Sequence, residues 1–298
     1  MNILITGGTG LIGRNFINRF DSQHRFTVLT RCPKLARDEL PQTCEFITDL
    51  NELEDLNRFE AIINLAGEPI VDKRWSDAQK AVIENSRFDI TQKLVDLIHA
   101  SDSPPTVFIS GSAIGIYGRQ GPNPIDEQFT DFHDEYSHRL CAKWESIAQQ
   151  AASATTRVCL LRTGIVLASD GGALDKMLLP FKLGLGGPIA SGQQFMSWIH
   201  IKDMVNAIHH LLTRPLSQGA YNLTAPTPQT NKQFAKSLCR VLGRPCIFPM
   251  PGFVLKTLMG EGSDLLIYGQ NVIPKALQHE EFSFLYPQLD DALTALLS

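Results

Sequence analysis

The sequence predicts an α/β fold in which helices cover both faces of a doubly wound parallel sheet, with a smaller C-terminal lobe. Near-continuous apolar strands alternate with helical patterns through the first 168 residues, which is typical of a parallel sheet buried on both faces. A glycine-rich turn joins the first of these strands to the first helix. Beyond residue 169 the alternation stops, and glycine and proline become frequent in GLGGPIASG (Gly184–Gly192).

The expected elements follow from the spacing of the apolar residues. Asn2–Ile5 is an apolar strand, and the apolar residues of Leu11–Phe20 recur at the period of a helix. The other expected strands are short apolar runs: Arg25–Thr30, Glu45–Ile47, Ala61–Leu65, Thr106–Ser110 and Arg157–Leu167. Longer periodic stretches between them predict helices over Ser76–Ala100 and Tyr136–Ala151.

Composition bounds the class of protein and its partners. Apolar residues make up 43% of the 298 and charged residues 19%, as in ordinary globular proteins. A net charge of −4 gives no general basic face, so we expect no nucleic-acid partner. The apolar runs fall short of the about 18 residues that span a bilayer, so no membrane partner is expected.

The N-terminus and the cysteines predict the compartment. A core strand occupies the first residues, so we expect no signal peptide. The six cysteines are scattered without a CxxC pair, which favours reduced thiols and a cytoplasmic protein over disulfides or zinc. No spaced set of ligands predicts a metal site.

The turn TGGTGLIG (Thr6–Gly13) is the strongest local signal. Gly7 would permit the tight turn, Gly10 the approach of a pyrophosphate, and Gly13 close packing of helix on strand. The start of the helix would offer free N–H groups to the phosphates. The strand–turn–helix context favours a dinucleotide site over a purely structural turn. We therefore expect a Rossmann-type domain over residues 1–168, with later segments able to complete its sheet, and a partly interleaved substrate lobe over 169–298.

The end of the second strand predicts which dinucleotide binds. A site for NAD would carry Asp or Glu there, on the ribose 2′-hydroxyl. This strand instead ends Leu29-Thr30-Arg31, and the guanidinium of Arg31 can donate two hydrogen bonds to a 2′-phosphate. NADP(H) is therefore the predicted cofactor. The alternative is that Arg31 is simply an exposed arginine.

Several motifs together resemble a known family. TGGTGLIG, NLAG, ISGSAIGIYG and LRTGIVL resemble the extended short-chain dehydrogenase/reductase superfamily, which includes nucleotide-sugar epimerases and dehydratases. A closer resemblance, to its atypical YfcH-like "epimerase family protein" branch, is carried by LAGEPI (Leu65–Ile70), Trp144-Glu145, Leu178–Asp203 and GQNVIPKAL (Gly269–Leu277). The resemblance implies a Rossmann fold and NADP(H), but no established substrate. It implies cofactor contacts from Gly7, Gly10, Leu11, Ile12, Gly13, Thr30, Arg31, Leu65, Ala66 and Arg87.

The resemblance also implies a catalytic set, with one departure. The superfamily uses a serine after the fifth strand and a YxxxK pair; Ser112 and Lys143 stand where the serine and the lysine are expected. Arg139 holds the tyrosine position, and an arginine can polarise an oxygen but cannot act as the acid–base. The nearest tyrosines are Tyr136, about 10 Å along the helix from the lysine, and Tyr117, for which a structural role is favoured.

Two functional hypotheses follow. The first is an NADP(H)-dependent oxidoreductase or epimerase-like enzyme, slow or narrow, acting on an acidic small or nucleotide-linked substrate. The second is an NADP(H) sensor that acts through partners, since the resemblance extends to plastid and cyanobacterial relatives associated with division. Trp198 and His200 would line a pocket in the first case, or else pack against the sheet. A homodimer is compatible with the sequence.

Overall fold

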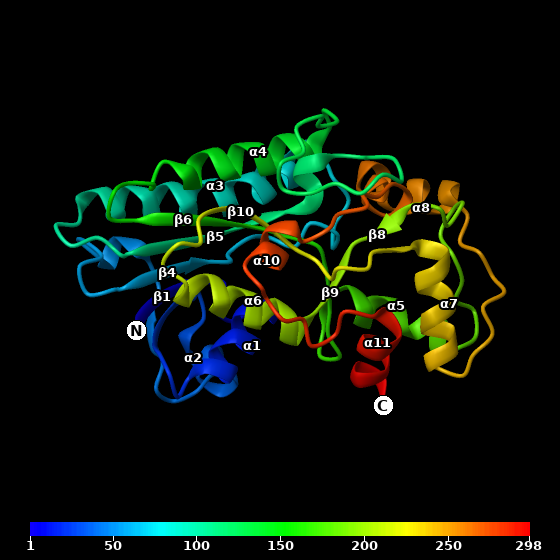
Figure 1. Cartoon of the computed structure of the whole chain (residues 1–298), viewed down its shortest axis with the longest axis horizontal. Helices are drawn as coiled ribbons and strands as arrows, with labels where there is room; N and C mark the ends of the chain where they lie inside the picture. Colours follow the sequence, from blue (N-terminus) through cyan, green and yellow to red (C-terminus); the bar gives the residue numbers. More distant parts are fainter.

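The computed structural model describes residues 1–298 and is built on a seven-stranded parallel sheet with helices on both faces (Figure 1). The strand order is β10-β6-β5-β4-β1-β2-β3. The strands are β1 (Asn2–Thr6), β2 (Arg25–Leu29), β3 (Glu45–Ile47), β4 (Ala61–Asn64), β5 (Val107–Ala113), β6 (Arg157–Thr163) and β10 (Gly219–Leu223). The predicted doubly wound fold is confirmed.

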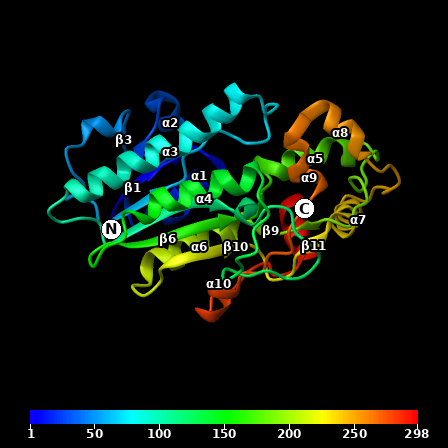
Figure 2. The same ribbon diagram turned by 90° about the horizontal axis from the view of Figure 1, so that it is seen from above.

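The two covered faces of the sheet explain why its strands carry consecutive apolar residues. Helices α1 (Leu11–Phe20) and α6 (Ile201–Thr213) cover one face, and α3 (Asp77–Ala100) and α4 (Tyr136–Gln149) cover the other (Figure 2). Along β1, Ile3 and Ile5 pack into the cluster under α1, while Leu4 packs into the cluster under α3. Alternate residues thus pack into different cores, so the middle of the strand is apolar at consecutive positions.

The remaining elements are short and mostly form the C-terminal lobe on the right of Figure 1. Two small sheets pair β7 (Ile165–Leu167) with β9 (Trp198–His200), and β8 (Phe195–Met196) with β11 (Gln229–Thr230). The other helices are α2 (Pro33–Glu39), α5 (Gly172–Lys182), α7 (Asn231–Val241), α8 (Gly252–Met259), α9 (Asp264–Ile267), α10 (Lys275–His279) and α11 (Leu289–Leu297). Short 3₁₀ turns are η1 (Leu50–Glu52), η2 (Ile114–Tyr117) and η3 (Gly260–Ser263). No helix combines the length and apolar character needed to cross a bilayer.

The lobe is interleaved with the sheet. The chain leaves the sheet after β6, builds α5 and the small strands, and returns through α6 to add β10 at the sheet edge. The single strand expected over Arg157–Leu167 is in fact two strands. The chain breaks at Gly164, where a Cβ would lie 2.4 Å from the Ser197 carbonyl oxygen. Beyond that contact, β7 pairs with β9 instead of the main sheet.

Trp198 and His200 are packing residues. Trp198 is fully buried in the core of the lobe, and the His200 ring stacks on Tyr286 with centroids 3.9 Å apart. Of the two expectations for this pair, the structure therefore supports packing.

Candidate functional site

Three of the four glycines of the turn, Gly7, Gly10 and Gly13, have different surroundings. Gly7 has φ +68°, and a Cβ there would lie 2.6 Å from the Leu65 carbonyl. A Cβ on Gly13 would lie 2.4 Å from the Gly7 carbonyl oxygen. A Cβ on Gly10 would meet only that same oxygen, at 3.2 Å. Packing therefore explains Gly7 and Gly13, whereas Gly10 faces open space.

The N-terminus of α1 is open toward that space. Gly10 is the N-cap residue, and no side chain caps the helix. The N–H groups of Leu11 and Ile12 precede the first intrahelical hydrogen bonds, so they remain available to a ligand. The helix dipole adds partial positive charge at the same point. This arrangement suits an anion, and a phosphate above all.

The end of β2 lies beside the glycine turn, because β1 and β2 are neighbours in the sheet. Thr30 is buried, and its hydroxyl accepts the N–H of Cys32 at 3.2 Å. Arg31 is exposed, and no carboxylate follows β2 before Asp38. Arg31 thus has the freedom to reach a ligand that crosses this edge.

Arg87 lies under the turn that follows β4. Its guanidinium donates to the carbonyl oxygens of Ile83 (2.9 Å) and Glu68 (3.1 Å) and sits 5.3 Å from the Trp144 ring. A Cβ on Gly67 would come within 2.9 Å of the guanidinium carbon. Burial lowers the pKa of Arg87. Because its partners are carbonyl oxygens and not carboxylates, its positive charge remains available to an anion.

Ser112 belongs to a buried polar network. Its hydroxyl donates to Glu145 Oε1 at 2.6 Å, and Arg162 donates to both oxygens of Glu145 at 2.9 Å. Arg162 also donates to the Tyr117 hydroxyl at 3.1 Å, which in turn donates to Asn222 at 2.7 Å. Burial raises the pKa of Tyr117 to about 12. Tyr117 is therefore a structural residue, as the sequence favours, and the Ser112 proton is committed to Glu145.

Arg139 and Lys143 do not join this network. Both side chains are exposed, and Arg139 pairs with Asp134 at 2.6 Å near the amino end of α4. The roles expected for these two residues beside Ser112 remain a prediction, which the exposure of both side chains does not favour. Residues four apart on a helix share a face, but the spacing alone does not say which face.

Ser137 and Cys141 hold the inward positions of α4 instead. Both are buried, and a Cβ on Gly115 would lie 3.3 Å from Ser137 Cβ and 3.5 Å from Cys141 Sγ. Glu145 continues the same stripe one turn later. The sequence carries a signal for this orientation. Leu140, Trp144 and the apolar residues at helical spacing from them form the buried face of α4.

A cavity of about 300 Å³ opens at the amino ends of α3 and α4, where they meet the C-terminal lobe. The rings of Trp75 and Tyr136 meet edge to face with centroids 4.9 Å apart. Lys80 pairs with Glu261 and Arg119 with Asp264, so two ion pairs join the lobes here. The cavity is lined by aromatic and charged groups, including Trp75, Tyr136, Lys80, Arg119, Arg139, Asp134, Glu135, Glu261 and Asp264.

A larger hollow, of about 640 Å³, lies at the end of the sheet where β1 and β2 begin, around Met1, His24 and Arg58. Open parallel sheets bind ligands at the carboxyl ends of their strands. The smaller cavity, at the end that also carries the glycine turn, is therefore the better candidate for a substrate.

Comparison with known proteins gives concordant results. Residues 3–224 match the NAD dependent epimerase/dehydratase family, and residues 250–296 match a domain of unknown function, DUF1731. The "Epimerase family protein SDR39U1 homolog, chloroplastic" of Arabidopsis thaliana is 40% identical over 304 residues, which is 100% of this chain and 87% of the plant protein. The crystal structure of human epimerase family protein SDR39U1 (isoform 2) with NADPH has a TM-score of 0.90 at 32% identity, covering 99% of both chains. UDP-glucuronic acid 4-epimerase from Bacillus cereus has a TM-score of 0.78 at 16% identity over 99% of this chain and 98% of that one, which shows the fold alone.

Proposed function

Because this chain belongs to the NAD dependent epimerase/dehydratase family, we propose that it binds NADP(H) at the carboxyl edge of its sheet. We further propose that it transfers hydride to or from a small or nucleotide-linked substrate in the cavity at the amino end of α4. The observation that carries the cofactor assignment is the uncapped N-terminus of α1 beside the open space at Gly10. The similar human protein was solved with NADPH, which supports the choice of cofactor.

The residues at this edge fit the parts of NADP(H). The N–H groups of Leu11 and Ile12 would hold the pyrophosphate, with Arg87 supplying further positive charge. Arg31 would bind the 2′-phosphate through bidentate, charge-assisted hydrogen bonds. Leu65 and Ala66, at the end of β4, would line the path of the cofactor. When bound, NADP(H) supplies or accepts the hydride.

The groups that could donate a proton for such a reaction are already engaged or hard to ionise. The Tyr136 hydroxyl lines the cavity but donates to the Lys80 carbonyl at 3.3 Å, and burial raises its pKa to about 12. Ser137 and Cys141 hold the buried positions of α4, and burial raises the pKa of Cys141 to about 12. The Ser112 hydroxyl donates to Glu145. A proton would therefore come from water or from the substrate, which predicts slow turnover. This same observation favours the second candidate function, an NADP(H) sensor that acts through a partner.

Calorimetric titration with NADPH and NADH tests the cofactor assignment. A charge-assisted contact contributes about 1.5–3 kcal/mol, so we expect NADPH to bind at least about tenfold more tightly. Arg31→Ala should abolish this preference. Arg25→Ala is the matched control, because Arg25 is also exposed but stands at the amino end of β2, away from the glycine turn. Equal affinities for the two cofactors would remove the assignment.

Turnover distinguishes the enzyme from the sensor. NADPH absorbance is followed with a panel of carbonyl compounds and sugar nucleotides, in the parent protein and in Arg119→Ala, which alters the cavity. Slow oxidation that Arg119→Ala impairs supports the enzyme. Tight NADPH binding with no turnover on any compound would favour the sensor.

A further inference from the structure

Large apolar side chains are exposed on two neighbouring segments of the C-terminal lobe. Eight of the fifteen exposed large apolar residues of the chain fall within residues 179–185 and 247–258. They include Leu179, Leu183, Ile247, Phe248, Phe253 and Leu258, and we call this surface the α5–α8 face. Such a concentration is unusual, because exposed apolar residues on a soluble protein are normally scattered.

The two segments form one continuous surface. The N–H of Ala190 donates to the Met250 carbonyl at 2.9 Å, and the N–H of Met250 donates to the Pro188 carbonyl at 2.9 Å. A Cβ on Gly184 would lie 3.5 Å from Pro245. Both α5 and α8 belong to the lobe on the right of Figure 1. Helix α8, although mostly apolar, buries none of its residues.

The charges on this surface are of one sign. Residues 179–190 and 243–258 contain Lys182, Arg244 and Lys256 and no Asp or Glu, in a chain whose net charge is −4. All three cations are exposed. The nearest carboxylate on α5, Asp175, lies one turn before Leu179. The ion pairs of the lobe use other cations, such as Lys176 with Asp72.

We infer that the α5–α8 face docks on an anionic lipid surface, with its apolar side chains entering the interface and its three cations meeting the headgroups. An apolar face bordered by lysine and arginine is the pattern of elements that lie in the plane of a membrane. Each such cation near an anionic leaflet adds to the attraction. This inference departs from the expectation that the protein has no membrane partner. That expectation rested on the lack of a spanning segment, and docking at a surface requires none.

The other occupants fit the charges less well. A second copy of the chain, docked about a twofold axis, would bring the same three cations against each other. A structured acidic protein would favour bidentate arginines and aromatic anchors of the Trp and Tyr type. This face has two lysines, one arginine and neither Trp nor Tyr, so it suits a fluid surface with diffuse negative charge.

Vesicle flotation of the full chain tests the inference. The probes are vesicles of phosphatidylcholine alone and vesicles in which one third of the lipid is phosphatidylglycerol. We expect flotation only with the anionic vesicles, weakening as salt is added. Absence of flotation with anionic vesicles at low ionic strength would overturn the inference, whatever the affinity for NADPH, which is measured separately.

Variants locate the contact. Lys256→Glu removes one positive charge and adds a negative one, so binding should weaken by about 30-fold. Phe253→Ser should weaken it by about tenfold or more, because a buried phenylalanine is lost. The controls are Lys34→Glu on α2 and Leu216→Ser, whose side chain is 93% exposed elsewhere on the surface. Equal loss in the controls, or a dimer in sedimentation that Phe253→Ser dissociates, would refute docking on lipid.

Discussion

Two substitutions in one turn should have opposite effects, because Gly10 and Gly13 have different neighbours. At Gly10 (φ −74°, ψ 170°) the backbone is in the extended region, which any residue adopts, and the only contact of a Cβ is 3.2 Å from the Gly7 oxygen. Gly10→Val should therefore fold normally while its side chain occupies the space proposed for the pyrophosphate. At Gly13 the Cβ would overlap backbone atoms, 2.4 Å from the Gly7 oxygen and 2.7 Å from Gly8 Cα.

The magnitudes follow from these contacts. For Gly10→Val, the reduced entropy of the unfolded chain stabilises by about 0.4–1 kcal/mol, and loss of a favourable N-cap costs a similar amount. The free energy of unfolding should thus change by less than about 1 kcal/mol. Losing two N–H contacts to phosphate, about 1.5 kcal/mol each, should weaken NADPH binding about 100-fold. Gly13→Ala should destabilise the protein by about 1–3 kcal/mol through overpacking.

Calorimetric titration with NADPH and thermal unfolding without cofactor measure both effects. The reasoning about the glycine turn is refuted if Gly10→Val binds NADPH as the parent does. It is equally refuted if Gly13→Ala keeps the parent melting temperature, because the contact at 2.4 Å would then carry no cost.

Three further outcomes are expected. Glu145→Leu leaves Arg162 buried without its partner and should cost about 3–5 kcal/mol in urea unfolding, and a loss below about 1 kcal/mol would contradict a buried ion pair. Burial lowers the pKa of His200 from 6.5 to about 4. Between pH 6.5 and pH 4 the unfolded chain therefore binds a proton at His200 that the folded protein does not. The free energy of unfolding, unaffected by this group at neutral pH, should fall by about 2 kcal/mol near pH 5. The His200 side chain caps α6 by accepting the Lys202 N–H at 3.0 Å, and asparagine can make the same cap. His200→Asn should therefore flatten that part of a stability-against-pH curve, and an unchanged curve would assign the loss to another group. Lys143→Met should leave the NADPH affinity within about twofold of the parent, because the lysine is exposed; a tenfold loss by titration would return Lys143 to the cofactor site.

The layered fold was predictable because its cause is local. A strand buried on both faces must be apolar at consecutive positions, as Ile3, Leu4 and Ile5 are, and this pattern is readable in five residues. The glycine turn was predictable for the same reason, since the positive φ of Gly7 and the close approach at Gly13 each leave room for no other residue.

The rotation of α4 about its axis, and the return of the chain to the sheet as β10, depend on contacts between residues far apart in the sequence. The motif spacing pointed to Lys143, whereas the contact of Trp144 with Gly111 on β5 helps to fix the rotation of the helix. Likewise, nothing within Gly219–Leu223 indicates that it pairs with Cys159–Thr163 in the central sheet. Information of this kind is absent from a single sequence and requires tertiary packing.

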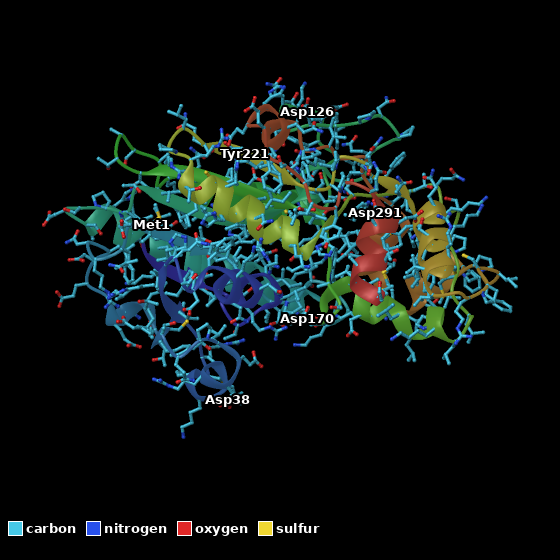
Figure 3. The ribbon with its side chains drawn as sticks, turned by 60° about the horizontal axis from the view of Figure 1, so that its bottom comes forward. Met1, Asp38, Asp126, Asp170, Tyr221 and Asp291 are labelled. Carbon is cyan, nitrogen blue, oxygen red and sulfur yellow. The ribbon has the colours of Figure 1, made fainter.

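The interleaving of lobe and sheet has a consequence for biosynthesis. Strand β6 is complete at Thr163, but its partner on the outer side, β10, begins only at Gly219 (Figure 3 labels Tyr221 within β10). While the intervening segment emerges from the ribosome, β6 presents an unpaired edge on which another chain can template a strand. The nascent chain therefore passes through an aggregation-prone window that ends only when Gly219–Leu223 has left the ribosome and paired with β6. Translation speed beyond residue 163 should therefore influence the yield of native protein.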